Sequence, residues 1–529
     1  MKCRWKMSLL LVLIVFFAVP AVAYPVPYTA LERTTAIENG YTLSAIAFQD
    51  LATGTLSTAE EETPCTTIIV GKDASADGSV IVGHNEDDGG DVVMRLHVVP
   101  RNTHPGSFKL TDGREVYKEP HTDLVIPVPK KSYAYVWSEM PGMDFSDSYV
   151  NEYGVIVVSD NAGGSREDKP ELVDGGIRYY LRRLAIEQAK TAREAVKIIG
   201  ELVEKYGYGH GGRVYIVADP NEAWVVQVVY GKHWLAQRVP DDGVVVIPNK
   251  YVSRYVDLSD TENFMGSKDL IEYAIKRGWY DPKEGPFDFV KVYGNPKAST
   301  ASYNIYRQQT GLYLLTGEVF PINDLPFSAK PKRKLTVQDV MEALRAVSSY
   351  GFNSELAKNM AGSFHNNVRS LTVRPISVWT TQESAVFQLR SDLPPEIGVV
   401  YWRAPNIPDI NAYVAWYPVA MIKAGVEFPR PYAYGDQYYI DFSSAYWAFR
   451  VFTNAVDYDY ANKIDSVRKI WDEFEKKEFE MQPIIESYAL ELYNKGKKKE
   501  AATLLAYYSS GLAMDAYTTA LELLRDWQS

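Results

Sequence analysis

A single cysteine stands directly before an apolar stretch in the first quarter of the chain. The stretch reads CTTIIVG from Cys65, and Pro64 precedes it. The other cysteine of the chain is Cys3. A thiolate is a strong nucleophile, and an unpaired cysteine outside the cell is exposed to oxidation unless it is buried. The residue type therefore leaves two interpretations of Cys65 open: a buried, inert thiol or a reactive nucleophile.

A second apolar stretch ends in polar side chains of the kind that assist a nucleophile. The segment SVIVGHNEDD carries His84, Asn85 and Asp87 close to its end. If this stretch pairs as a hairpin with the one that starts at Cys65, its polar end returns beside that cysteine. The hairpin would bring all three side chains near the thiol. Without the cysteine, the same polar cluster would be typical of a solvated turn.

The common metal and nucleotide signatures do not occur in the sequence. None of the seven histidines belongs to an HExxH motif or an HxH pair, and there is no CxxC. A GxSxG elbow, a Walker A loop and a GxGxxG motif opening a helix are also missing. We therefore expect neither a metal ion nor an organic cofactor.

The first residues have the pattern of an export signal. Three basic residues precede the uncharged apolar run MSLLLVLIVFFAV, and AVA at 21–23 supplies small residues for cleavage. The run is shorter than the roughly 20 apolar residues of a membrane span. We expect residues 1–23 to be removed, together with Cys3, and the protein to be secreted or extracytoplasmic. Membrane contact would be limited to this signal, and a retained N-terminal anchor is the alternative.

Residues 24–64 differ in composition from the chain that follows. They begin with two closely spaced prolines and end in LATGTLSTAEEETP, which is small, polar and acidic. This composition is typical of a leader or propeptide that ends in an exposed linker. An ordinary N-terminal extension that is kept is the alternative.

Charge and composition exclude one class of partner. The formal net charge is −11, and the chain has no Lys/Arg run of the type that binds nucleic acid. The chain is 46% apolar and 23% charged, as in a globular protein. We expect no nucleic-acid partner.

Strand and helix patterns follow each other in blocks after Cys65. β-Branched strand patterns run to about residue 160, and a helical pair follows, whose second helix has Thr191 and Glu194 at capping-box spacing and ends at Gly207. Strands return to about residue 248, and residues 255–330 look loop-rich with some helix. Strands recur before residue 403, and the chain is helical beyond about 440. This order predicts a layered α+β architecture.

The first block after the leader also resembles a known family. CTTIIVGKDASADGSVIVGHNEDD is similar to the start of the mature chain in secreted dipeptidases of the PepD type. These are cysteine N-terminal-nucleophile (Ntn) hydrolases, related to bile-salt hydrolases and penicillin V acylases. The resemblance continues through NEYGV at 151–155 and through residues 222–249 and 277–289, and covers most of residues 65–440.

The resemblance implies a four-layer αββα Ntn-hydrolase sandwich with a C-terminal helical extension. The expected division of the chain is a signal peptide at 1–23, a leader or propeptide at 24–64, a catalytic domain at 65–440 and a helical region at 441–529. The C-terminal helices would either brace the core or form a contact in a homo-oligomer.

The family mechanism makes Cys65 the first residue of the mature chain. Cleavage of the Pro64–Cys65 bond, by the thiol itself or by another protease, would leave a thiol and an α-amine on one residue. Their ordinary pKa values, about 8.5 and about 7.7–8.0, are close enough for the amine to act as general base. Attack on an amide carbon would give a thioester, which water hydrolyses.

Five further residues match positions that are functional in the family. Asp87 corresponds to the carboxylate that orients the amine. Asn151 and Asn249 correspond to amides near the nucleophile that stabilise an oxyanion, although an asparagine taken singly is typical of a turn. His84 stands where relatives carry arginine, and would bind substrate or merely pack. Arg307 is a candidate substrate-binding arginine, with a surface position as the alternative.

These residues together predict a secreted cysteine dipeptidase that hydrolyses small peptides. A non-peptide N-acyl amidase with the same machinery is one alternative. A non-catalytic surface binding protein, with Cys65 buried and the leader retained, is another.

Overall fold

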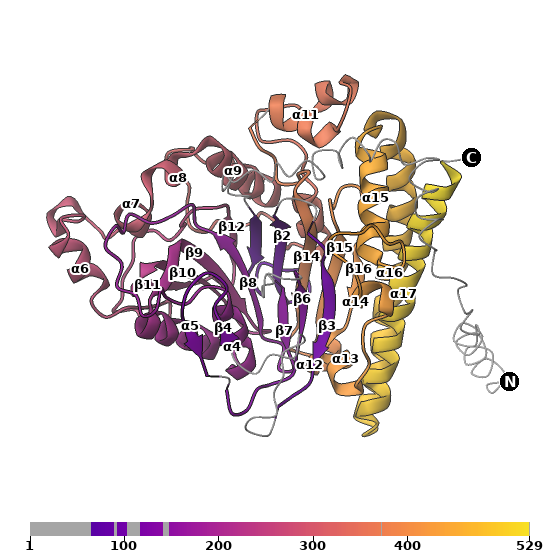
Figure 1. Ribbon diagram of the computed structural model, residues 1–529, viewed down its shortest axis with the longest axis horizontal. Helices are drawn as coiled ribbons and strands as arrows, with labels where there is room; N and C mark the ends of the chain where they lie inside the picture. The colour runs from indigo at the N-terminus through magenta and orange to yellow at the C-terminus, as the bar shows by residue number, and fades with distance from the viewer. Residues whose placement is uncertain are drawn as a thin grey trace. The chain divides into compact units, whose positions relative to one another are not determined.

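Two antiparallel sheets pack face to face at the centre of the protein, as the computed structural model shows (Figure 1). The structure describes residues 65–88, 92–102, 117–127, 129–140, 148–371 and 373–527. They belong to one compact unit, Glu60–Trp527. The expected signal peptide at 1–23 and leader at 24–64 lie outside the described residues, so both stay predictions.

The six-stranded sheet contains the two strands that the first motifs predicted. Its order is β12 (Val244–Ile247), β1 (Thr66–Val70), β2 (Val80–Asp87), β14 (Thr381–Leu389), β15 (Val399–Pro405) and β16 (Val414–Trp416). β1 and β2 pair antiparallel, with Thr66 opposite Asn85. The predicted hairpin is therefore present, and the polar end of β2 returns beside the start of β1.

The second sheet has eight strands and faces the first. Its order is β13 (Phe264–Gly266), β11 (Trp234–Arg238), β10 (Ala223–Gly231), β9 (Tyr208–Ala218), β8 (Ile156–Asn161), β7 (Tyr149–Asn151), β6 (Tyr135–Glu139) and β3 (Arg95–Val99). A separate two-stranded ribbon consists of β4 (Tyr117–Lys118) and β5 (Val125–Ile126). Side chains cross between the two large sheets, for example from Thr67 on β1 to Asp160 on β8.

Helices cover the outer face of each sheet. α4 (Tyr180–Gln188) and α5 (Ala192–Tyr206) share an apolar core with the eight-stranded sheet. α5 begins where predicted, since the Glu194 N–H donates to the Thr191 side chain, and it ends at Gly207. α9 (Ser302–Thr316) and α10 (Val337–Leu344) cover part of the six-stranded sheet. The predicted α+β class, with four layers in the order αββα, is confirmed.

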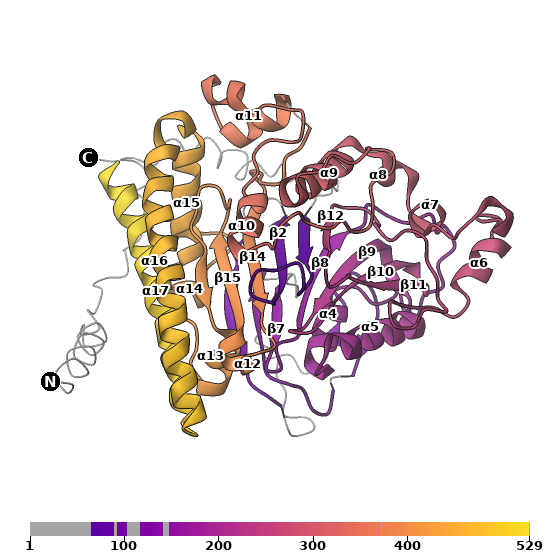
Figure 2. The ribbon, with the colours of Figure 1, turned by 180° about the vertical axis from the view of Figure 1, so that it is seen from behind.

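The C-terminal helices cover the rest of the six-stranded sheet. They are α15 (Ala445–Asp457), α16 (Tyr460–Asn494) and α17 (Lys498–Asp526), and Figure 2 shows the long α16 and α17 side by side. Ile485 and Leu505 share an apolar core with Trp402 on β15. These contacts favour the bracing role, while the predicted homo-oligomer and the boundary at 440 stay predictions. Within the described part of the chain, no helix is both long and apolar enough to cross a membrane.

Short helices occupy the connections between these elements. They are α6 (Leu270–Lys276), α7 (Phe289–Tyr293), α8 (Pro296–Thr300), α11 (Phe364–Leu371), α12 (Pro395–Gly398), α13 (Pro418–Ala424), α14 (Arg430–Ala433) and two 3-10 turns, Pro282–Glu284 and Glu355–Asn359.

A buried histidine joins α11 to the C-terminal helices. The His365 ring lies 2.6 Å from Asp457 Oδ1 through Nδ1 and 3.1 Å from Asp409 Oδ1 through Nε2. The Ser377 and Tyr460 hydroxyls also donate to Asp409. Burial lowers the pKa of His365, but the two carboxylates outweigh burial and raise this pKa to about 10. The imidazolium is therefore the form that the fold stabilises.

We expect the stability contributed by His365 to be lost in alkaline solution. Because the folded-state pKa is raised, the contribution is complete below pH 6.5 and disappears as the pH rises through 10. The difference in unfolding free energy between wild type and His365→Gln should fall across this range by up to about 5 kcal/mol. Urea unfolding of both proteins, with the exposed His121→Gln as control, measures it. A difference that does not change with pH would contradict the prediction.

Candidate active site

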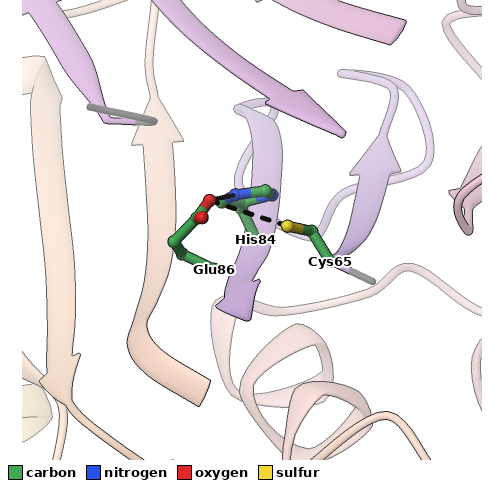
Figure 3. A group of neighbouring side chains, drawn as sticks. All are labelled: Cys65, His84 and Glu86. Atoms are coloured by element: carbon green, nitrogen blue, oxygen red, sulfur yellow. Dashed lines mark hydrogen bonds and ion pairs between the residues drawn. The ribbon is translucent and has the colours of Figure 1, made fainter. Parts of the chain in front are cut away.

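The Cys65 thiol is buried beside the end of β2. Its side chain belongs to the residue just before β1, and Sγ lies 3.7 Å from Glu86 Oε2 and 4.0 Å from the Asp87 carbonyl oxygen. Sγ, a ring nitrogen of His84 and a carboxylate oxygen of Glu86 all lie within 4.8 Å of one another. Figure 3 shows the three side chains pointing toward one another. The predicted meeting of His84 with Cys65 is therefore found.

The strand alternation of β2 separates its polar residues. His84 and Glu86 point to the same side, toward the eight-stranded sheet. Asn85 points to the other face, where its Nδ2 donates to the Leu344 and Ile376 carbonyls. The expectation that Asn85 lies at the thiol is wrong, because neighbouring residues of a strand face opposite ways.

Hydrogen bonds across the sheets orient the His84 ring. Thr67 Oγ1 donates to Asp160 Oδ2 at 2.6 Å and lies 2.8 Å from His84 Nδ1. Because the hydroxyl has one proton and gives it to Asp160, His84 Nδ1 must carry the proton of its own bond to Thr67. The other ring nitrogen, Nε2, then faces Glu86 Oε2 at 3.2 Å. His84 is thus held in the site, rather than packed away from it.

Arg307 connects the nucleophile residue to two asparagines. From α9, its Nη1 donates to the Cys65 carbonyl at 2.6 Å, and its Nη2 donates to Asn249 Oδ1 at 2.9 Å and Asn304 Oδ1 at 2.7 Å. Burial, followed by the nearby Arg374, lowers the pKa of Arg307. The side chain is 0% exposed, so the surface alternative is wrong. Its substrate-binding role is also corrected, because these N–H groups donate to protein atoms and position the site.

Asn249 presents an unused donor beside this arginine. It follows β12, and its Oδ1 is held by Arg307. Its Nδ2 is buried and has no hydrogen-bond partner in the described part of the chain. A buried donor without a partner costs roughly 1–3 kcal/mol, so this group gains a hydrogen bond when an acceptor reaches it. The group is suited to donate to an oxyanion, as predicted for Asn249.

Asn151 does not belong to the site. Its Nδ2 donates to the Ile186 and Ala189 carbonyls at the end of α4, at 2.9 and 2.7 Å. Its Oδ1 accepts from the backbone N–H groups of Tyr153 and Val155. Both N–H groups of the amide are therefore used within the fold. The predicted oxyanion role is wrong, because this side chain caps α4 and the turn after β7.

The Asp87 carboxylate is held by two residues far along the chain. Thr381 Oγ1 donates to Oδ1 at 2.5 Å, and Arg374 Nη2 donates to Oδ2 at 2.7 Å. Burial raises the pKa of Asp87, against the opposing effects of Arg374 and Thr381. The Asp87 atom that contacts the nucleophile is its backbone carbonyl oxygen, 4.0 Å from Cys65 Sγ. The predicted contact of the Asp87 carboxylate with the α-amine of a mature Cys65 stays a prediction.

Several residues of the site were not found from the sequence. Glu86 and Thr67 carry a signal in hindsight: Glu86 shares a strand face with His84, and Thr67 is the cross-strand partner of His84. Asp160 comes from the other sheet, and Arg374 lies 287 residues after the aspartate that it contacts. Nothing local in the sequence marks these two.

The side chains of Cys65, His84 and Glu86 are of the types that bind zinc. Thiolate sulfur, imidazole nitrogen and carboxylate oxygen are all ligands that Zn²⁺ accepts, and here they lie within 4.8 Å of one another. The sequence motifs did not indicate this group, because His84 and Glu86 are spaced for a strand rather than for a metal-binding helix. The expectation of a metal-free enzyme stays a prediction.

Known proteins with similar sequences are peptidases. The model of peptidase family C69 matches residues 64–473. A probable dipeptidase of Salmonella dublin is 30% identical over 376 residues, covering 67% of this chain and 80% of that protein. A dipeptidase of Bifidobacterium longum is 27% identical over 453 residues, covering 77% of this chain and 79% of that protein.

Solved structures give weaker matches. A penicillin V acylase from Agrobacterium tumefaciens matches with a TM-score of 0.32 and 13% identity, over 67% of this chain and 86% of that one. A conjugated bile acid hydrolase from Clostridium perfringens, in a mutant form, matches with a TM-score of 0.33 and 12% identity, over 66% of this chain and 91% of that one.

The family match spans both sheets and includes every residue described above around the thiol. The chain belongs to peptidase family C69, a family of cysteine peptidases, and is a peptide hydrolase.

Proposed function

We propose that the protein is a dipeptidase whose nucleophile is Cys65. One observation carries the proposal: a single guanidinium, that of Arg307, bonds both the Cys65 carbonyl and the amide oxygen of Asn249. It thereby fixes the nucleophile residue relative to a buried amide whose Nδ2 has no hydrogen-bond partner among the described residues. The names of relatives, which include dipeptidases, support a dipeptide substrate.

The chemistry needs a free α-amine on Cys65. Cleavage of the Pro64–Cys65 bond supplies it, and the amine then takes the thiol proton as general base. The thiolate attacks the peptide carbonyl, and the oxyanion accepts from Asn249 Nδ2. The ammonium returns its proton to the leaving amine as the C–N bond breaks. Water, activated by the same amine, then hydrolyses the thioester and releases the second amino acid.

We also propose that the protein is exported from the cell that makes it. The pattern of residues 1–23 supports passage through a membrane and release into an extracytoplasmic space. The leader at 24–64 would keep the α-amine of Cys65 in a peptide bond until cleavage. An enzyme activated only after export would not hydrolyse peptides inside the cell that makes it.

The N-terminus of the active protein tests this proposal. We expect the intact mass of the exported, active form to correspond to a chain that begins at Cys65. Iodoacetamide should add one carbamidomethyl group and abolish dipeptide hydrolysis, and excess substrate should slow both effects equally. A fully active protein that still carries residues before Cys65 would refute the mechanism, since that form has no α-amine on this residue.

A further inference from the structure

We propose that Cys65, His84 and Glu86 form a binding site for one zinc ion, and that this ion inhibits the enzyme. The binding site follows from the geometry of the three side chains and does not depend on the reaction. The inhibition rests on the proposed function, because it requires Cys65 to be the nucleophile. The ion is a reversible inhibitor in this inference and not a cofactor of the reaction.

The three candidate ligand atoms lie close to the positions that zinc requires (Figure 3). Zn–S bonds are about 2.3 Å long, and bonds to nitrogen or carboxylate oxygen are about 2.0–2.2 Å. In a tetrahedron, these lengths put nitrogen about 3.4 Å and sulfur about 3.6 Å from the oxygen. His84 Nε2 lies 3.2 Å from Glu86 Oε2, and Cys65 Sγ lies 3.7 Å from the same oxygen. Sγ and a ring nitrogen lie within 4.8 Å of each other, so small side-chain rotations bring all three atoms onto one ion.

The zinc ion takes the places of two protons that the site holds. The Cys65 thiol donates one to Glu86 Oε2, and another lies in the hydrogen bond between this carboxylate and His84 Nε2. Binding releases both protons to solvent, and bonds from zinc to sulfur, nitrogen and oxygen form instead. Because two protons leave as Zn²⁺ enters, the net charge of this buried site does not change. The site therefore pairs the charge of the ion without a further buried counter-charge.

The far side of the imidazole is held in the way that zinc sites hold it. A histidine that binds a metal through one ring nitrogen usually donates from the other to an acceptor that fixes the ring. Here the Nδ1–H of His84 bonds the Thr67 hydroxyl at 2.8 Å, and that hydroxyl donates to Asp160 at 2.6 Å. This chain of bonds leaves Nε2 as the nitrogen that faces Glu86. The ring orientation that zinc requires therefore exists before the ion binds.

Zinc on Cys65 blocks the proposed reaction at its first step. The sulfur lone pair that would attack the peptide carbonyl forms the Zn–S bond instead. The fourth tetrahedral position takes water or the α-amine of the mature Cys65, and an amine bound to zinc has no lone pair to act as general base. Removal of the ion restores the thiol and the amine, so the inhibition is reversible.

Equilibrium dialysis of the mature enzyme against ZnCl₂ tests the site without any variant. We expect one zinc ion per chain, a loss of dipeptide hydrolysis in proportion to the bound metal, and full recovery of activity in EDTA. Enzyme alkylated beforehand with iodoacetamide should not bind this ion, because the thiol of Cys65 is blocked. The absence of a stoichiometric ion, or zinc binding that alkylation leaves unchanged, would overturn the site. Full activity with one zinc ion bound per chain would overturn the inhibition.

Variants then assign the bound ion to these side chains. Glu86→Gln should weaken zinc binding by at least about 10²-fold, and Thr67→Val, which removes only the partner of the His84 ring, by about 10–100-fold. Glu139→Gln is the matched control, because it disrupts another histidine–carboxylate pair, that of Glu139 with His97 between β3 and β6. The control should bind zinc as the wild type does. Unchanged affinity in Glu86→Gln would overturn the assignment.

The outcomes separate this inference from the proposed function. An active enzyme that begins at Cys65 and binds no zinc would overturn the zinc site and leave the mechanism intact. If the wild type binds zinc through its thiol but Cys65→Ala keeps normal turnover, the binding site stands. That result would refute the nucleophile and, with it, the inhibition.

Discussion

Cys65→Ala is expected to abolish dipeptide hydrolysis. The substitution removes the atom that forms the thioester, and the remaining groups can only bind and polarise the substrate. Loss of a covalent nucleophile lowers turnover by at least about 10⁴-fold in enzymes that depend on one. Release of free amino acids from a dipeptide, measured with purified protein, gives the result directly. Normal turnover would refute the proposed mechanism.

The same variant reports on maturation. If the thiol cleaves the Pro64–Cys65 bond, the Cys65→Ala chain keeps its leader, and its intact mass is larger than that of the wild type. If another protease cleaves the bond, both chains begin at residue 65. Cys65→Ser is the matched control for the loss of side-chain volume, because the serine hydroxyl keeps a polar atom near Glu86. Both variants should unfold close to the wild-type temperature, which separates lost chemistry from lost structure.

The local parts of the fold were predictable because local patterns determine them. The β1 and β2 stretches are β-branched and apolar with a turn-rich segment between them, and α5 carries its own cap at Thr191. The cluster around the thiol followed from the hairpin alone. The choice of residues in the cluster did not follow from the hairpin. Successive residues of a strand point to opposite faces, so Glu86 lies at the sulfur and Asn85 points away from it.

α9 shows why another part of the site was hidden. The buried residues in its first two turns and a half are polar: Asn304, Arg307, Gln308 and Gln309. Hydrophobic periodicity cannot identify such a helix, because the side facing the core carries the wrong residue types. Arg307 therefore looked equally compatible with the surface. Its fixed place became clear only from acceptors in two other parts of the chain, the Cys65 carbonyl and the Asn249 side chain.

The two asparagines show the limit of a motif match. Asn151 and Asn249 each stand at the end of a strand, and each matches an active-site amide of the family. What distinguishes them is the second partner: α4 supplies two carbonyls that use both N–H groups of Asn151, whereas α9 supplies a guanidinium that holds the oxygen of Asn249. The Nδ2 group of such an asparagine is available to substrate only where the neighbouring element offers donors, which hold the amide oxygen, rather than acceptors, which use the N–H groups.

Asn249→Asp is expected to lower kcat by about 10²–10³-fold, the usual effect of removing one oxyanion donor. The aspartate keeps the oxygen that accepts from Arg307 and replaces Nδ2, which has no partner in the described chain, by a second oxygen. The transition state then meets an acceptor where it needs a donor. Single-turnover and steady-state kinetics with a dipeptide measure the effect, and KM should change far less than kcat.

Asn151→Asp is the matched control for this change. It removes the two N–H donors that hold the end of α4. Loss of these two hydrogen bonds should lower the unfolding free energy by roughly 2–4 kcal/mol in total. Turnover per folded molecule should stay close to the wild-type value, because the Asn151 amide faces α4 and not the thiol. If the two variants lost kcat equally, the unpaired Nδ2 of Asn249 would have no special part in catalysis. A kcat loss confined to Asn249→Asp would make this amide the group that carries the oxyanion.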